Sequence, residues 1–233
     1  MSAGINSMKY LNRFDSKKLL IALLYPLVLL SSCATWAIDI KVVNEDQKPL
    51  AHALVVVHLN KQRQLATDLV EIEQIDRQFN PQVRIIDSGQ SVDFPNRDET
   101  QHHVYSFSKA KTFEIKLYKD TPIEPIQFST PGIVALGCNI HDQMQGFIHV
   151  LSAYELGFYS NDQGMVDLDS QLNLADIQSL EVWHIKQRIP LSKRQKIAIT
   201  SINSLNGQPL VVELAIRPVK LKQTNKTFGT SKF

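Results

Sequence analysis

The segment that decides the fold is GIVALGCNIHDQMQGFIHVL, residues 132–151. Its two ends, Ile133 to Cys138 and Phe147 to Leu151, are short apolar runs of strand length, and a short polar loop separates them. A loop whose ends are held by strands keeps its side chains in fixed positions. The segment therefore predicts two strands with a rigid loop between them.

The rest of the chain repeats this pattern of short strands and turns. Many short strands with regular turn signals are typical of an all-β sandwich. A short turn of helix is expected only over residues 170–178, and Asn206-Gly207 predicts a hairpin that joins the last two strands. Further strands are expected at residues 38–43, 53–59, 71–75, 83–86, 91–94, 104–107, 112–117, 126–129, 179–185, 196–202 and 210–217.

Composition and charge exclude two classes of protein. With 43% hydrophobic and 21% charged residues, the chain of 233 residues has a globular and not a disordered composition. Its net charge of +2 arises in residues 1–37, because the remainder holds 21 of the 25 basic and 22 of the 23 acidic residues. Phosphate binding needs a basic face, so this near-neutral remainder argues against nucleic acid as a partner.

The first 37 residues have the pattern of a secretory signal peptide. A basic segment from Lys9 to Lys18 precedes an apolar run from Leu19 to Leu30, which at about 12 residues is too short to span a bilayer. Thr35-Trp36-Ala37 places small residues where a cleavage site needs them. Residues 1–37 are therefore predicted to direct export to a bacterial periplasm. Leu30-Ser31-Ser32-Cys33 also fits a lipoprotein signal, in which Cys33 would be lipidated and would hold the protein at a membrane.

Metal-ligating side chains gather in the loop of the opening segment. Cys138, His141 and Met144 place a thiolate, an imidazole and a thioether within seven residues, and His102-His103 offers a second imidazole. Two imidazoles, one thiolate and a weak axial thioether form the donor set of a blue-copper centre. Zinc sites more usually bring further cysteine or histidine ligands and no methionine. The alternative is that Cys138 is a buried, inert cysteine.

Residues 93–150 resemble the cupredoxins, especially plastocyanin, pseudoazurin and amicyanin. The resemblance is carried by three stretches of the sequence: residues 94–98 followed by His102-His103-Val104, residues 129–132 before Cys138, and residues 144–150. It implies a Greek-key β-sandwich that binds one type 1 copper ion through His102, Cys138, His141 and Met144. His103 stands where these families often carry an asparagine that tethers the cysteine loop, and it is the alternative to His102 as the first ligand.

The flanking sequences are similar to a second kind of β-sandwich. Residues 39–43 and 48–57 resemble the opening strands of carboxypeptidase-regulatory-like modules, and residues 161–168 resemble their continuation. The whole arrangement resembles periplasmic cupredoxin-like proteins that are labelled methylamine utilization proteins. We therefore expect four parts: a signal peptide at 1–37, a copper domain at 69–151, a second small sandwich built from 38–68 and 152–218 with the copper domain inserted, and a disordered tail at 219–233.

The remaining polar residues are expected to have structural roles. Asp98 and Asp142 are interpreted as solvated loop carboxylates, and His149 as a structural residue of its strand; the alternative is that His149 contacts a metal ligand or provides an exit for electrons. No second histidine cluster suits the additional copper that copper enzymes need, so the protein is not expected to be an enzyme. The functional hypothesis is a periplasmic one-electron carrier with a redox partner protein. The alternative is a copper-binding or assembly module without redox turnover, and a membrane is a partner only if Cys33 is lipidated.

Overall fold

The computed structural model describes residues 39–120, 124–168, 172–197 and 209–217. The predicted signal peptide, the Asn206-Gly207 turn and the predicted tail therefore lie outside the described residues. Within these residues the chain is all-β, as predicted, and its one helical segment is the 3₁₀ turn Leu174–Asp176. No helix among the described residues is both long and apolar enough to cross a membrane.

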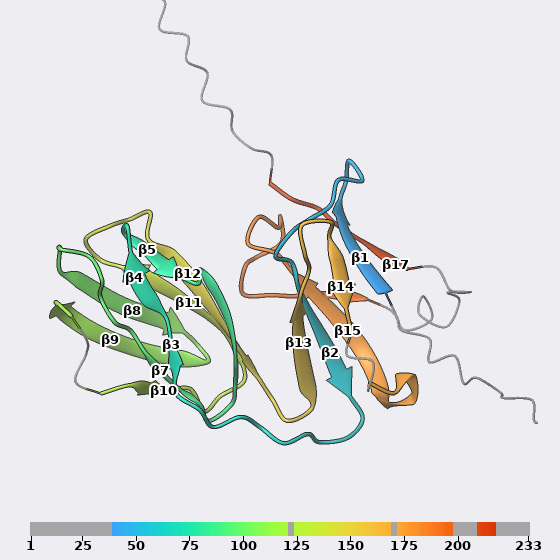
Figure 1. Cartoon of the computed structure of the whole chain (residues 1–233), viewed down its shortest axis with the longest axis horizontal. Coiled ribbons are helices and arrows are strands. Elements are labelled where there is room, and N and C mark those ends of the chain that lie inside the picture. The colour runs from blue at the N-terminus through green and yellow to red at the C-terminus, as the bar shows by residue number, and fades with distance from the viewer. Residues whose placement is uncertain (1–38, 121–123, 169–171, 198–208, 218–233) are drawn as a thin grey trace, which may run out of the picture. The chain divides into compact units, whose positions relative to one another are not determined.

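The segment 132–151 lies at the centre of a five-stranded sheet (Figure 1). The order of its strands is β6 (Val83–Asp87), β12 (Gln145–Leu151), β11 (Gly132–Cys138), β8 (His102–Ser108) and β9 (Lys111–Tyr118). Strands β11 and β12 pair antiparallel with Gly137 opposite Gln145, so the ladder closes directly at the base of the polar loop. The expected pair of strands around a fixed loop is confirmed.

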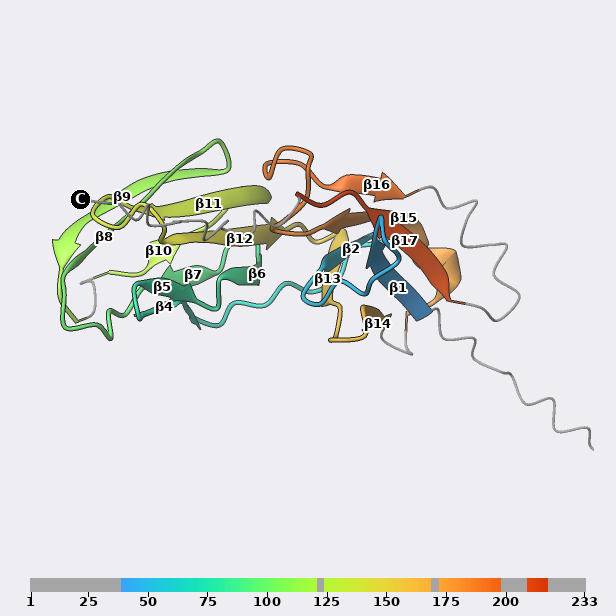
Figure 2. The ribbon, with the colours of Figure 1, turned by 90° about the horizontal axis from the view of Figure 1, so that it is seen from above.

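Five short strands face this sheet. They are β3 (Val70–Glu71), β4 (Glu73–Ile75), β5 (Gln78–Asn80), β7 (Ser91–Asp93) and β10 (Ile126–Gln127), and Figure 2 shows β5 and β7 in one layer with β8, β9 and β11 in the other. The predicted strand 71–75 is thus two strands interrupted at Ile72, and β5 was not predicted. Apolar side chains from both layers form one core, which includes Phe94, Val104, Phe128, Val134, Cys138, Met144 and Ile148.

Strands from before residue 60 pair with strands from after residue 151. A four-stranded sheet has the order β13 (Glu155–Tyr159), β2 (Leu54–Leu59), β15 (Ile177–Trp183) and β16 (Gln195–Ile197). A three-stranded sheet has the order β14 (Met165–Asp167), β1 (Asp39–Asn44) and β17 (Leu210–Leu214). These sheets share a second apolar core. The division of the chain into an inserted copper domain and a second sandwich stays a prediction.

The hairpin predicted from Asn206-Gly207 cannot be compared with the structure, because its turn and most of its first strand lie outside the described residues. The described parts of its two strands pair elsewhere as well: β16 pairs antiparallel with β15, and β17 pairs parallel with β1.

A third apolar cluster joins β12 to β15. The rings of Phe147 and Trp183 have their centroids 5.2 Å apart, and the His149 ring lies 4.5 Å from that of Trp183. His149 is completely buried, and this burial together with the nearby Arg194 charge lowers its pKa well below the ordinary histidine value. The interpretation of His149 as a structural residue agrees with this packing.

Candidate metal centre

Three of the predicted ligands meet at one end of the five-stranded sheet. The Nδ1 atom of His102 lies 3.6 Å from the Sγ atom of Cys138, and the Nδ1 atom of His141 lies 3.7 Å from the same sulfur. The ligand atoms of the three residues all lie within 4.8 Å of one another. Among the described residues, no other group of three or more histidine, cysteine or acidic side chains is placed in this way.

The start of β8 decides which histidine reaches the cysteine. The pairing of β8 with β9 is irregular between His102 and Val104, and successive side chains there point to opposite faces of the sheet. His102 is fully buried next to Cys138. His103 is only partly buried, and its Nε2 atom lies 2.9 Å from a carboxylate oxygen of Glu114. The structure therefore brings His102, and not His103, to the cysteine.

The loop from Cys138 to Met144 is held by main-chain hydrogen bonds. The amide of Met144 donates to the carbonyl of His141 at 2.8 Å, which closes the loop on itself. The amide of Asn139 donates to the carbonyl of His103 at 3.3 Å, so the backbone ties this loop to β8 although the expected asparagine is absent. Met144 is 1% exposed and belongs to the same core cluster as Cys138.

Asp98 was interpreted as a solvated carboxylate, and this interpretation is wrong. Its side chain is only 14% exposed, and its Oδ2 atom lies 2.8 Å from Nε2 of His102. The amides of Asp76 and Arg77 donate to the two carboxylate oxygens at 2.7 and 2.9 Å. Burial alone would raise the pKa of Asp98, but the hydrogen bonds from Arg77, His102 and Asp76 together lower it. The carboxylate therefore remains ionised behind the His102 ring.

A second set of polar residues beneath the site was also missed by sequence reasoning. Gln74 is fully buried and donates to the Phe94 carbonyl at 2.9 Å and to the Tyr118 hydroxyl. Tyr118 donates in turn to the Phe94 carbonyl at 2.7 Å, and burial raises the pKa of Tyr118. This network fixes the start of the loop that leads from Phe94 to His102. No local sequence signal marks it, because the three residues are far apart in the chain.

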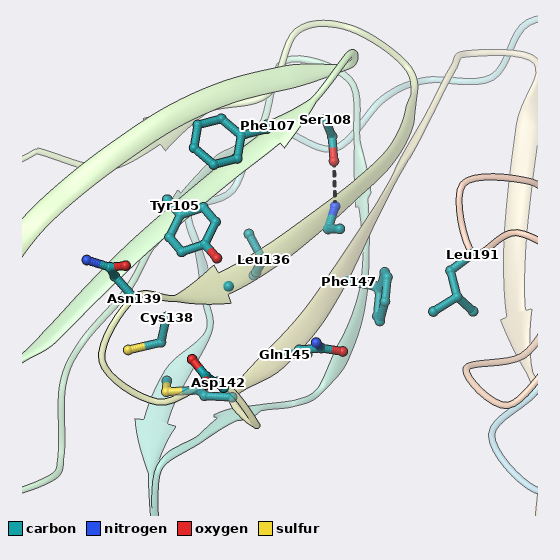
Figure 3. A pocket seen from close by; sticks show the side chains of 13 residues that line it. Tyr105, Phe107, Ser108, Leu136, Cys138, Asn139, Asp142, Gln145, Phe147 and Leu191 are labelled. Carbon is teal, nitrogen blue, oxygen red and sulfur yellow. Dashed lines mark hydrogen bonds between the residues drawn. The ribbon is translucent and has the colours of Figure 1, made fainter.

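A hollow of about 510 Å³ opens on the outer face of the sheet beside Cys138 (Figure 3). The rings of Tyr105 and Phe107 line it side by side on β8, with centroids 5.1 Å apart, and Phe107 is 81% exposed. Tyr105 packs against Gly137, where an added Cβ atom would lie 2.8 Å from the ring carbon Cζ. The residue before the cysteine must therefore be small for this ring to lie where it does.

A second hollow, of about 470 Å³, adjoins the partly exposed His141 ring. Its lining is mostly polar and consists of Asp76, Arg77, Gln78, Gln82, Gln143 and Gln145, together with His141, Asp142 and Met144. Asp142 is exposed, as predicted for a solvated carboxylate. His141 is thus the one predicted imidazole ligand that combines a place in the centre with partial exposure to solvent.

The residues present fit a single metal ion. A nitrogen ligand at about 2.0 Å and a thiolate at about 2.3 Å from an ion are at most about 4.3 Å apart, and the measured separations of 3.6 and 3.7 Å lie below this limit. Two imidazoles and a thiolate suit the borderline and soft metal ions. Both oxygens of Asp98 accept main-chain amides, so a His102 proton on Nε2 would complete the hydrogen bonds of this carboxylate and leave Nδ1 free to bind.

Comparison with solved structures finds partial likenesses to copper proteins. The Cu-containing nitrite reductase NirK from Thermus scotoductus SA-01 is 24% identical over 38% of this chain and 24% of its own, with a TM-score of 0.34. A reduced mutant of amicyanin is 17% identical over 38% of this chain and 87% of its own, with a TM-score of 0.33. A purple cupredoxin from Nitrosopumilus maritimus is 18% identical over 36% of this chain and 98% of its own, with a TM-score of 0.31.

This chain therefore spans about a quarter of the nitrite reductase, and each of these likenesses covers less than half of this chain. A scan against protein-family models and a search of curated proteins find no match.

Proposed function

We propose that the protein holds one type 1 copper ion at His102, Cys138 and His141, with Met144 as a weak axial ligand, and carries single electrons. The observation that carries this proposal is the placement of both Nδ1 atoms at 3.6–3.7 Å from the one thiol sulfur. Met144 is supported by its burial in the same core and by the hydrogen bond from its amide to His141. A thiolate, two imidazoles and a thioether are the ligands of blue-copper electron-transfer centres.

The residues around the site favour electron transfer over chemistry on a substrate. When bound, copper supplies a centre that alternates between two oxidation states without breaking a bond. Cys138 and His102 are 3% and 0% exposed, so water and substrates do not reach them directly. Asp98 and the core around Met144 hold the ligands in place, and a site that does not rearrange is suited to fast one-electron exchange.

The place of action and the partner belong to the same proposal. The basic and apolar leader with its cleavage site supports export to the periplasm, where a redox protein would exchange electrons with this one. Mass spectrometry of the purified protein tests this part. A mature chain that begins at Ile38 agrees with a soluble periplasmic carrier, whereas an acylated Cys33 would make the protein a lipoprotein and bring a membrane into its surroundings.

A copper titration followed by visible and EPR spectroscopy tests the central claim. We expect one equivalent of Cu(II) to produce an intense thiolate-to-copper absorption in the red part of the visible spectrum, and Cys138→Ser to abolish this absorption while the protein stays folded. Copper that binds without this absorption would favour the copper-holding or assembly module instead. If Cys138→Ser keeps the absorption, Cys138 is not a ligand and the proposal is wrong.

A further inference from the structure

Asp98 connects one of the proposed ligands to a turn that is distant in the sequence. Its Oδ2 atom lies 2.8 Å from Nε2 of His102, within hydrogen-bonding distance. The same carboxylate accepts the amides of Asp76 and Arg77, which form the two-residue turn between β4 and β5. Both turn residues have positive φ, at 54° and 59°, as a tight hairpin of this kind requires. The carboxylate therefore serves three donors from two parts of the chain.

We propose that Asp98 is a positioning residue, which locks the His102 ring with Nδ1 turned toward Cys138 and ties it to the β4–β5 turn. This inference rests on the proposed function, because it concerns the same donor set. Both carboxylate oxygens already accept main-chain amides, so the carboxylate faces Nε2 as an acceptor at 2.8 Å and we assign the ring proton to Nε2. The lone pair then lies on Nδ1, the nitrogen that is 3.6 Å from the Cys138 sulfur.

The carboxylate is itself prevented from turning. Two main-chain amides hold the carboxylate, and the main-chain amide of Asp98 donates to Oδ1 of Asn96 at 2.9 Å, which anchors the backbone at this residue. Asn96 is anchored in turn, because its side-chain amide donates to the Thr100 carbonyl at 2.8 Å. A hydrogen-bonding partner that is fixed in this way holds the ring orientation before any metal binds.

The same turn also lines the hollow next to His141. Asp76 and Arg77 contribute to the wall of that hollow, which His141 and Met144 line as well. The Asp98 carboxylate thus contacts Nε2 of His102 and also binds the turn that lines the hollow beside His141, the other proposed imidazole ligand. Loss of the carboxylate would leave two amide donors and one imidazole N–H without their partner. Each of these groups would then move or form a hydrogen bond with water. His102 and His141 would no longer be linked through the same carboxylate.

The experiment compares the full mature chain with Asp98→Ala, Asp98→Asn and the matched control Glu99→Gln. Glu99 is the next residue in the same loop and is exposed, so its replacement removes an equal charge without touching His102. Copper affinity is measured by titration against a chelator of known affinity, and the reduction potential by voltammetry. On the metal-free protein, nitrogen NMR of the imidazoles reports the His102 tautomer, and hydrogen exchange reports the amides of Asp76 and Arg77.

We expect Asp98→Ala to weaken copper binding about 10-fold or more, as loss of a ligand's hydrogen-bonding partner generally does. The reduction potential should rise, because a negative charge that stabilises Cu(II) is lost. In the metal-free variant the His102 tautomers should mix, and both amides should exchange faster. Asp98→Asn keeps one acceptor oxygen and should give a smaller loss, and it replaces the alanine variant if that variant does not fold. Glu99→Gln should change the affinity less than about twofold, because it breaks no contact with a ligand.

Two results would overturn the inference. The first is an unchanged His102 tautomer and unchanged amide exchange in the metal-free Asp98 variants. The second is an effect of Glu99→Gln on copper affinity and reduction potential that equals the effect of the Asp98 variants. Such a result would mean that the Asp98 charge, and not its hydrogen bond to His102, determines both quantities. If the wild-type protein binds no copper, the proposed function is wrong, while the tautomer and exchange measurements still decide whether Asp98 positions His102.

Discussion

Gly137→Ala should either lower or raise the free energy of unfolding, depending on a single neighbouring side chain. The added Cβ atom would lie 2.8 Å from Cζ, 2.9 Å from the hydroxyl oxygen and 3.2 Å from Cε2 of Tyr105. Contacts of a Cβ atom below 3.0 Å essentially never occur in proteins, so the ring must withdraw. Gly137 is not among the glycines with positive φ, so the backbone itself accepts alanine. The cost therefore comes from Tyr105, and overpacking of this kind destabilises proteins by about 1–3 kcal/mol.

Removal of the ring should reverse the effect. In a Tyr105→Ala background the three closest contacts of the methyl group are gone, and alanine in a strand is favoured over glycine by about 0.5–1 kcal/mol because the unfolded chain loses freedom. Gly137→Ala should thus destabilise the wild-type protein and stabilise the Tyr105→Ala protein, with a coupling energy of about 2 kcal/mol. Urea unfolding of the four metal-free proteins measures both changes. The same sign in both backgrounds would show that the backbone near Cys138, and not the tyrosine, requires glycine.

Four further substitutions test the ligands and the electrostatics. His102→Gly should lose the thiolate-to-copper absorption and regain it with added imidazole, whereas His103→Asn should keep it; the opposite result would exchange the two assignments. Met144→Leu should leave copper bound and raise the reduction potential measured by voltammetry, since a weak axial donor tunes the site, and loss of most copper affinity would contradict this role. Asp87 is desolvated, which raises its pKa, but hydrogen bonds from Arg63 and from a backbone amide lower the pKa overall. Its contribution to stability is therefore complete above the unfolded-state pKa and declines as the pH falls below about 5. Asp87→Asn should lower the free energy of unfolding at pH 7 by about 2 kcal/mol and should reduce the decline of this free energy at low pH, as measured by chemical unfolding. An unchanged decline at low pH would show that Asp87 does not cause it.

The sequence predicted the strands well wherever apolar runs and turn residues coincide. The strands predicted at 53–59, 83–86, 112–117, 133–138 and 147–151 appear within two residues of their expected limits, because each is a short apolar or alternating run bounded by turn residues. β13 was not predicted, and it contains Gly157, a residue that weakens a strand pattern in the sequence. The glycine has a structural reason: a Cβ atom at this position would lie 2.9 Å from Ile85. Close packing against β6 makes this glycine suitable for a strand, and that contact is not visible in the local sequence.

The candidate ligands could be predicted because three of them lie within one short loop. Spacing and donor chemistry identify Cys138, His141 and Met144, and strand alternation predicts that only one of His102 and His103 can face them. Asp98 could not be found in this way. Its role depends on contacts with the Asp76–Arg77 turn, more than twenty residues earlier, and a lone aspartate in a polar loop looks the same whether it is solvated or buried.

The register of two strand pairs, more than the loop itself, determines whether the proposed ligands can meet. Gly137 stands opposite Gln145 on one side and opposite Tyr105 on the other. This register turns Cys138 into the core and places Gly137 under the tyrosine ring. A shift of one residue would move Cys138 to the outer face and bring Gly137 into the core. The apolar side chains of β11 would be turned outward by the same shift, so the free energy that fixes the core also fixes the thiol beside His102. The candidate metal centre therefore needs no stabilising interactions of its own to place its thiol on the correct face of the sheet.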